Sequence, residues 1–251
     1  MCFNQWTDYI DRLPNWEEEM IGVYDYTVIL TYMSLISGVL GIIIAVTGAG
    51  HPELGIFFLM VSGILDTFDG RVAKTKKNRT DMEKNFGMQI DSLADLICFG
   101  ILPVSIGLAN LRISGIFTEL VKRKNYEGSF PMLIILLVIA LFYVLAALIR
   151  LAYFNATTEM RVEEAKETGV TYYVGLPVTS SALIFPLVMI LHFFGKWDLT
   201  VFYFLVMLIV AMAFVMNIKV RKPGKVGIAI FIAIGVIEFI LSIVAFTMYT
   251  D

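Results

Sequence analysis

The sequence predicts an all-α integral membrane protein. Of its 251 residues, 58% are hydrophobic and only 16% are charged, and the mean hydropathy is +0.79. These values exclude a disordered chain and an ordinary soluble domain. Apolar runs close to membrane-spanning length recur along the chain, and they lack the alternation of polar and apolar residues that a membrane β-barrel requires.

Seven apolar stretches approach or exceed the roughly 20 residues that a helix needs to cross a bilayer. Each is expected to be a helix, because lipid offers no hydrogen-bond partners to the backbone. The stretches are 26–48, 54–73, 88–110, 131–153, 174–194, 199–218 and 226–249. No repeat or linker divides them, so residues 26–251 are expected to form one transmembrane domain.

Residues 1–25 are acidic and do not resemble a cleavable signal, which needs a basic start and a short apolar core. Apolar side chains recur there at helical spacing, at Phe3, Trp6, Ile10 and Leu13. This segment is therefore expected to lie in the membrane interface as a short helix, or else to be a frayed polar tail.

The distribution of Lys and Arg predicts which ends of the helices face the cytoplasm. Connections 74–84 and 219–225 are rich in these residues, which favours placing both in the cytoplasm, although the basic residues of 111–130 are a signal in the opposite direction. We expect a protein of the cytoplasmic membrane of a prokaryote, with the segment around residues 66–95 at the cytoplasmic face.

The strongest functional signal is a set of four aspartates on two neighbouring apolar helices: Asp66, Asp69, Asp91 and Asp95. Spacings of three and four residues place each pair on one face of its helix. Any one of them could simply cap a helix or lie at the interface. Four together are harder to explain in this way, because an acid within a membrane costs roughly 2.5–3.5 kcal/mol at a helix centre. Divalent cations would compensate that cost.

Small residues share the faces that carry these aspartates: Gly70, Ala73 and Gly87. They leave room for a bulky group to approach the backbone. Magnesium prefers carboxylate oxygen and shares its coordination sphere with substrate phosphates, and two such ions can stabilise charge as a P–O bond breaks. The pattern predicts a site for two Mg²⁺ or Mn²⁺ ions and a phosphate-bearing substrate, with one aspartate available as a general base.

The run Asp66-x-x-Asp69-Gly70-x-x-Ala73-Lys74, followed by Gly87-x-x-x-Asp91-x-x-x-Asp95, resembles the signature of the CDP-alcohol phosphotransferase family. Lys74 stands where that family has arginine. A lysine keeps the positive charge but cannot donate two parallel hydrogen bonds to a phosphate, and Arg71 could supply part of that donation. The resemblance implies a six-helix core, a homodimer, and a seventh helix added at 226–249.

Family members transfer a phosphoryl-alcohol unit from a CDP-alcohol to a hydroxyl acceptor and release CMP. The resemblance implies that Asp66, Asp69 and Asp91 bind metal, and that Asp95 completes the site and acts as the base. It also implies that the small residues admit the cytidine nucleotide, with Arg71 and Lys74 as further substrate contacts.

Three further segments resemble membrane phosphatidylserine synthases: 91–103, 150–155 (with Tyr153 where arginine is usual) and 175–177. In the first helix, Ser34 replaces a common asparagine. The resemblance implies CDP-diacylglycerol, or a CDP-linked ether lipid, as donor and serine as acceptor. Arg150 is expected either to bind the serine carboxylate or a donor phosphate, or merely to extend towards the interface.

Two rival functions remain open. Glycerol phosphate or inositol phosphate could be the acceptor, although a second phosphate would call for more inward-facing cations. The aspartates could instead line a cation pathway in a transporter, although their clustering at one membrane face is unusual for that class. Nothing in the sequence indicates a nucleic-acid partner.

Overall fold

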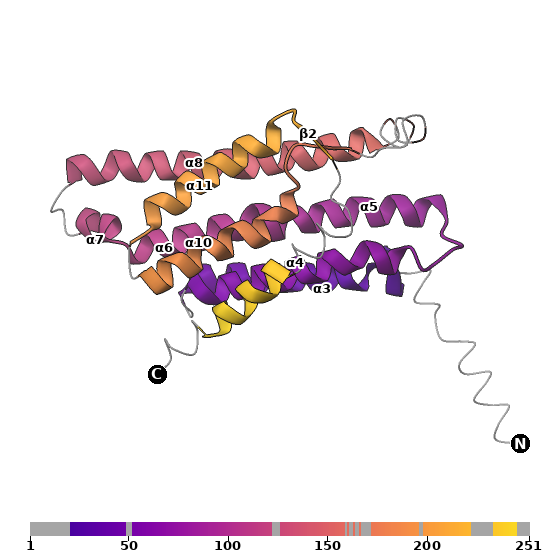
Figure 1. The fold of residues 1–251 in the computed structure, drawn as a ribbon, viewed down its shortest axis with the longest axis horizontal. Coiled ribbons are helices and arrows are strands. Elements are labelled where there is room, and N and C mark those ends of the chain that lie inside the picture. Colours follow the sequence, from indigo (N-terminus) through magenta and orange to yellow (C-terminus); the bar gives the residue numbers. More distant parts are fainter. Residues whose placement is uncertain are drawn as a thin grey trace, which may run out of the picture.

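The structure is a computed structural model that describes residues 21–48, 52–121, 126–158, 160, 163, 166, 172–195, 198–221 and 233–244. The expected interfacial segment therefore lies almost wholly outside the described residues. The described part is a layered bundle of helices, with α8 and α11 on one side, α3 and α4 on the other, and α5, α6 and α10 between them (Figure 1).

The first half of the bundle contains α3 (Tyr26–Thr47), α4 (Pro52–Ala73) and α5 (Asp81–Asp95). A π-helix, η1 (Leu96–Ile101), continues α5 directly into α6 (Leu102–Ile113). The second half contains α7 (Gly115–Val121), α8 (Tyr126–Ala156), a short 3₁₀ turn η2 (Val178–Ser180), α10 (Ser181–Gly195) and α11 (Thr200–Val215). A last described helix spans Ala233–Val244 and lies within the expected seventh stretch.

Three described helices are long and apolar enough to cross a membrane: Tyr26–Thr47, Asp81–Ile113 and Phe130–Ala156. Helix α4 has 22 residues but contains Glu53, Asp66, Asp69 and Arg71. The expected span 174–194 is shorter than predicted, because the chain first forms a strand and η2, and α10 itself has only 15 residues. Many large apolar side chains face outwards, among them Ile36, Leu141 and Ile209, as in a protein covered by lipid.

One small element departs from the all-α prediction. Strands β1 (Tyr172–Val174) and β2 (Lys219–Arg221) pair antiparallel, with Tyr172 opposite Arg221. This pair ties the segment before α10 to the end of α11. The sequence did not reveal it, because three residues are too few for a strand pattern to emerge.

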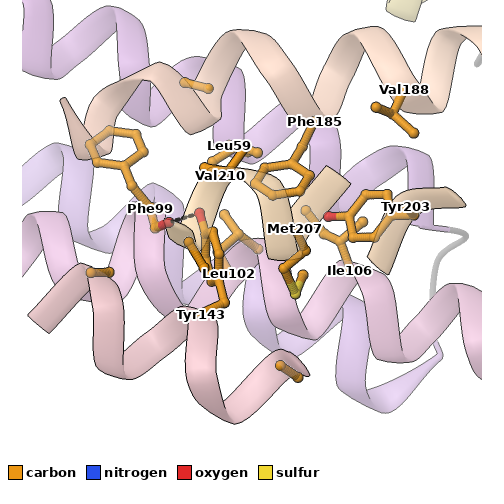
Figure 2. Packing of buried hydrophobic residues seen from close by; sticks show 14 of the residues in the cluster. Leu59, Phe99, Leu102, Ile106, Tyr143, Phe185, Val188, Tyr203, Met207 and Val210 are labelled. Carbon is orange, nitrogen blue, oxygen red and sulfur yellow. Dashed lines mark hydrogen bonds between the residues drawn. The ribbon is translucent and has the colours of Figure 1, made fainter. Parts of the chain in front are cut away.

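Aromatic residues fill the core between η1, α6, α8, α10 and α11 (Figure 2). The rings of Phe185 and Tyr203 lie 5.0 Å apart, and the Tyr203 hydroxyl donates to the Pro103 carbonyl at 2.8 Å. The Tyr143 hydroxyl donates to the Phe99 carbonyl at 2.7 Å. Each buried tyrosine thus has a partner for its hydroxyl, which removes the penalty of burying it.

The π-helix η1 is followed after one residue by Pro103. Pro103 has no N–H, so it cannot donate to the Phe99 carbonyl four residues earlier. Tyr143 on α8 supplies that hydrogen bond instead, as Figure 2 shows. Because η1 begins directly after Asp95, this widened turn determines how the acidic face of α5 is oriented relative to α6.

Helices α3 and α4 approach closely through small polar residues. Ser34 donates to the Ser62 carbonyl at 3.2 Å, and Ser62 donates back to the Ser34 carbonyl at 3.0 Å. A Cβ on Gly38 would lie 2.5 Å from the Cys98 sulfur of η1. Small residues of this kind allow close helix packing in membranes, and here they fix α4 against α3 and η1.

Candidate active site

Three of the four expected aspartates converge. Asp66 of α4 and Asp91 and Asp95 of α5 each offer a carboxylate oxygen, and these oxygens all lie within 4.8 Å of one another. All three side chains are partly exposed. The i, i+4 spacing on α5 and the facing position on α4 therefore produce the cluster that the sequence predicted.

Asp69 lies beside this cluster but is more deeply buried, at 8% exposure. Its Oδ2 accepts a hydrogen bond from the Thr31 hydroxyl at 3.0 Å. Asp69 lies three residues after Asp66, so both belong to the same stripe of α4. Asp69 thus joins the site through one oriented carboxylate, and Thr31 of α3 is a positioning residue that the sequence analysis did not single out.

The cluster is electrostatically unfavourable without a cation. Two ionised carboxylates at 4.8 Å repel by about 3.5 kcal/mol at an effective dielectric constant of 20. Hard divalent cations bind carboxylate oxygens and leave coordination positions for water and phosphate. The donor set of Asp66, Asp91 and Asp95 fits Mg²⁺ or Mn²⁺, and its partial exposure leaves a path for a substrate.

The glycines beside the cluster differ in their surroundings. A Cβ on Gly70 would meet no atom within 4 Å, so there is open space beside it. A Cβ on Gly87 would lie only 2.6 Å from a terminal nitrogen of Arg79. Among the described residues, the space beside Gly70 is therefore open, whereas at Gly87 a side chain of the protein fills it.

The cations at the end of α4 and in the turn before α5 differ in their surroundings. Arg71 and Lys74 are exposed, and the Arg71 guanidinium lies 5.8 Å from the centre of the Phe68 ring. Lys76 contacts Asp25 at 2.6 Å and Glu83 at 2.7 Å. Its hydrogen bond to Asp25 lowers the pKa of that carboxyl to about 2. Lys76 therefore ties the start of α3 to the start of α5.

The start of α5 is fixed locally as well. The Thr80 side chain accepts from the Glu83 N–H, and the Glu83 side chain accepts from the Thr80 N–H, which completes a capping box. Asp25 caps α3 by accepting from the Thr27 N–H at 2.8 Å. The starts of α3 and α5 are thus both fixed by side-chain caps.

Arg150 of α8 is buried, at 6% exposure. Its Nε donates to the Leu176 carbonyl at 3.2 Å, and its guanidinium lies 5.2 Å from the centre of the Phe154 ring. It therefore does not extend into solvent. It lines a cavity of about 220 Å³ together with Ile149, Tyr153, Phe214, Val215, Met216 and Asn217.

A polar contact links α8 to the acidic helix. The Asn155 amide donates to the Ser92 hydroxyl at 2.9 Å, and Ser92 directly follows Asp91. The same face of α8 carries Ala147, which would lie 3.5 Å from a Cβ on Gly100. Arg150 lies between these two positions along α8, and its own contacts include the Leu176 carbonyl and the Phe154 ring.

The model of the family described as CDP-alcohol phosphatidyltransferase matches residues 27–220, which is well over half of the chain. The chain belongs to this family. The matched region includes every described helix from α3 to α11 and the whole aspartate cluster. The family resemblance seen in the sequence is confirmed.

Several relatives carry the name CDP-diacylglycerol–serine O-phosphatidyltransferase. The one from Saccharomyces cerevisiae is 31% identical over 140 residues, which cover 55% of this chain and 42% of that protein. The one from Helicobacter pylori is 30% identical over 210 residues, which cover 81% of this chain and 75% of that protein. The one from Methanocaldococcus jannaschii is 25% identical over 166 residues. The match spans less than half the length of the yeast relative.

Proposed function

We propose that this family member transfers the phosphatidyl group of CDP-diacylglycerol to the hydroxyl of serine and releases CMP. The observation that carries the proposal is the convergence of Asp66, Asp91 and Asp95 on a partly exposed cluster. Open space beside Gly70 and the names of the relatives support it. The CDP-linked lipid supplies the phosphate chemistry that such a cluster favours.

Two divalent ions fit this donor set, with Asp66, Asp69 and Asp91 as ligands and Asp95 completing the site. When bound, the ions would hold oxygens of the diphosphate and stabilise the charge that develops on the leaving phosphate. The carboxylates are held for this task by the fold: Thr31 orients Asp69, and the capping box fixes the start of α5.

Asp95 is proposed as the general base. Its carboxylate takes the proton of the serine hydroxyl, whose oxygen then forms a bond to the phosphorus that bears the diacylglycerol. The bond from that phosphorus to the bridging oxygen breaks, and CMP departs with the oxygen. A base that lies within the cluster is in reach of a hydroxyl aimed at the same phosphorus.

Arg150 is proposed to bind the carboxylate of serine. Its burial and the cavity of about 220 Å³ that it lines support this role. A guanidinium suits a carboxylate because it offers paired donors in one plane. Glycerol phosphate and inositol phosphate remain the alternative acceptors, and Arg150 would then have to bind a phosphate.

The membrane setting is part of the proposal. The three long apolar helices and the exposed apolar side chains support a bilayer, with the aspartates at its cytoplasmic face. A homodimer is expected as well. The acceptor assay below can be run in detergent or in proteoliposomes, so it does not depend on either of these points.

The experiment is to measure CMP release by the purified protein from CDP-diacylglycerol with Mg²⁺ or Mn²⁺ and one acceptor at a time. We expect release with serine and little with glycerol phosphate or inositol phosphate. Asp91→Asn should abolish it. Asp81→Asn is the matched control, because Asp81 lies on the same helix but is exposed and pairs only with Lys84 in the described part of the chain.

The opposite results would overturn the proposal. If CMP release is faster with a phosphorylated acceptor than with serine, serine is not the acceptor, and the protein catalyses the family's reaction with another alcohol. Ion flux through liposomes that Asp91→Asn abolishes, without any CMP release by the unmodified protein, would instead favour a transporter.

A further inference from the structure

Arg79, in the turn between α4 and α5, forms no ion pair with any carboxylate that the structure describes. One terminal nitrogen donates to the Glu83 carbonyl at 3.0 Å. Its Nε is buried and has no hydrogen-bond partner among the residues that the structure describes. A buried donor without a partner costs about 1–3 kcal/mol, and more when it is charged. An anionic ligand that engaged the guanidinium would offset that cost.

The guanidinium lies over the first turns of α5, beside the Glu83 carbonyl and Gly87. Its terminal nitrogen would lie 2.6 Å from a Cβ on Gly87, and Gly87, Asp91 and Asp95 follow one another at intervals of four residues. Residues at this spacing have Cβ atoms about 5–6 Å apart. The Arg79 guanidinium therefore lies about one helical turn from Asp91, on the same stripe of α5. Because Gly87 has no side chain, it leaves room for the Arg79 side chain to pass over the helix at this point.

Charge balance explains why a cation is needed there. The four aspartates carry up to four negative charges, which two divalent ions would neutralise. The diphosphate of a CDP-linked lipid adds two further negative charges that these ions leave uncompensated. On the α4 side the available cations, Arg71 and Lys74, are exposed to solvent. Arg79 is only partly exposed, and its planar fork matches the oxygens of a phosphate.

We propose that Arg79 binds a phosphate of the cytidine nucleotide, and that Gly87 provides the space through which its side chain reaches that phosphate. This inference rests on the proposed function and deepens it by assigning a binding residue outside the aspartate signature. The competing explanation is purely structural: Arg79 would only hold the Glu83 carbonyl at the start of α5.

The test compares Arg79→Gln, Arg79→Lys and the matched control Lys77→Gln. Lys77 lies in the same turn but is exposed, so its substitution removes one charge without touching α5. For each protein we would measure the KM for CDP-diacylglycerol, the KM for serine and the thermal midpoint. The dissociation constant of CMP would be measured in the presence of Mn²⁺ and without any acceptor.

Arg79→Gln should raise both the KM for the CDP-lipid and the dissociation constant of CMP by about 10-fold or more, the loss expected for a charged hydrogen bond. Arg79→Lys should show a smaller effect, because it keeps the charge. The KM for serine should not change, and Lys77→Gln should match the unmodified protein. If Arg79→Gln does not fold, the KM for the CDP-lipid and the dissociation constant of CMP are compared between Arg79→Lys and the unmodified protein instead.

CMP binding and a CDP-lipid KM that are unchanged in the Arg79 variants, whatever their thermal midpoints, would overturn the inference in favour of the structural explanation. The CMP measurement needs no acceptor, so it is independent of the choice of serine. If the unmodified protein releases no CMP from CDP-diacylglycerol, the proposed function fails. If it does and only the Arg79 result is negative, this inference alone fails.

Discussion

Thr31 offers a sharp test of how the site is held, because it touches the aspartates without being a ligand itself. Its hydroxyl donates to Asp69 Oδ2 at 3.0 Å, and both side chains are buried. Thr31→Val keeps the shape of the side chain and removes only the donor. The variant therefore isolates a single hydrogen bond between α3 and α4.

The expected magnitude follows from the charge of the acceptor. A hydrogen bond to a charged group contributes about 1.5–3 kcal/mol, which corresponds to roughly 10–150-fold in a binding constant. Residues that orient metal ligands typically change metal affinity by about 10–100-fold when substituted. We therefore expect Thr31→Val to raise the Mn²⁺ concentration needed for half-maximal CMP release by at least about 10-fold.

Two controls separate this effect from loss of stability. Thr31→Ser retains the hydroxyl and should retain most of the metal affinity. Ser37→Ala removes another hydrogen bond from α3 to α4, 3.0 Å long, whose acceptor is the Phe58 carbonyl, about three turns from Asp69 along α4. It should lower the thermal midpoint without changing the Mn²⁺ dependence. An unchanged Mn²⁺ dependence in Thr31→Val would refute the claim that α3 orients the site.

Three further substitutions test other parts of the account. Tyr143→Phe leaves the Phe99 carbonyl without its partner and should lower the free energy of unfolding by about 1–3 kcal/mol in a denaturation assay; an unaltered stability would show that the π-helix does not need this bond. Gly38→Ala places a methyl group 2.5 Å from the Cys98 sulfur and should destabilise the α3–η1 contact by about 1–3 kcal/mol, which equal thermal midpoints would contradict. Arg150→Lys should raise the KM for serine about 10-fold or more with little change for the CDP-lipid; equal effects on both substrates would argue against a role in binding the serine carboxylate.

Much of the fold could be predicted because one physical rule dominates in a membrane. Continuous apolar runs must be helical there, and α3 and α8 accordingly lie close to their predicted bounds. The short lengths of α10 and α11 were harder to foresee. Apolar residues continue beyond the ends of both helices, so hydropathy alone does not mark where the backbone leaves the helix.

The site was predictable to the extent that it depends on spacing within a helix. Intervals of three and four residues placed the four aspartates in two pairs, each on one face of its helix, and three of them, Asp66, Asp91 and Asp95, meet in the structure. Contacts between helices were not readable in this way. Thr31 and Asp69 form a hydrogen bond although they are 38 residues apart in the sequence. The Arg79 side chain lies against Gly87 because the turn before α5 folds back onto that helix.

The account depends most on divalent ions at the aspartate cluster, and direct metal binding tests this most simply. Titration of the purified protein with Mn²⁺, followed by electron paramagnetic resonance, should show two bound ions. Asp91→Asn should lose at least one of them, and Asp81→Asn should bind as the unmodified protein does. Chelation should abolish CMP release, and added Mg²⁺ or Mn²⁺ should restore it. A protein that binds no divalent ion and still releases CMP at its full rate in the presence of chelator would contradict the account.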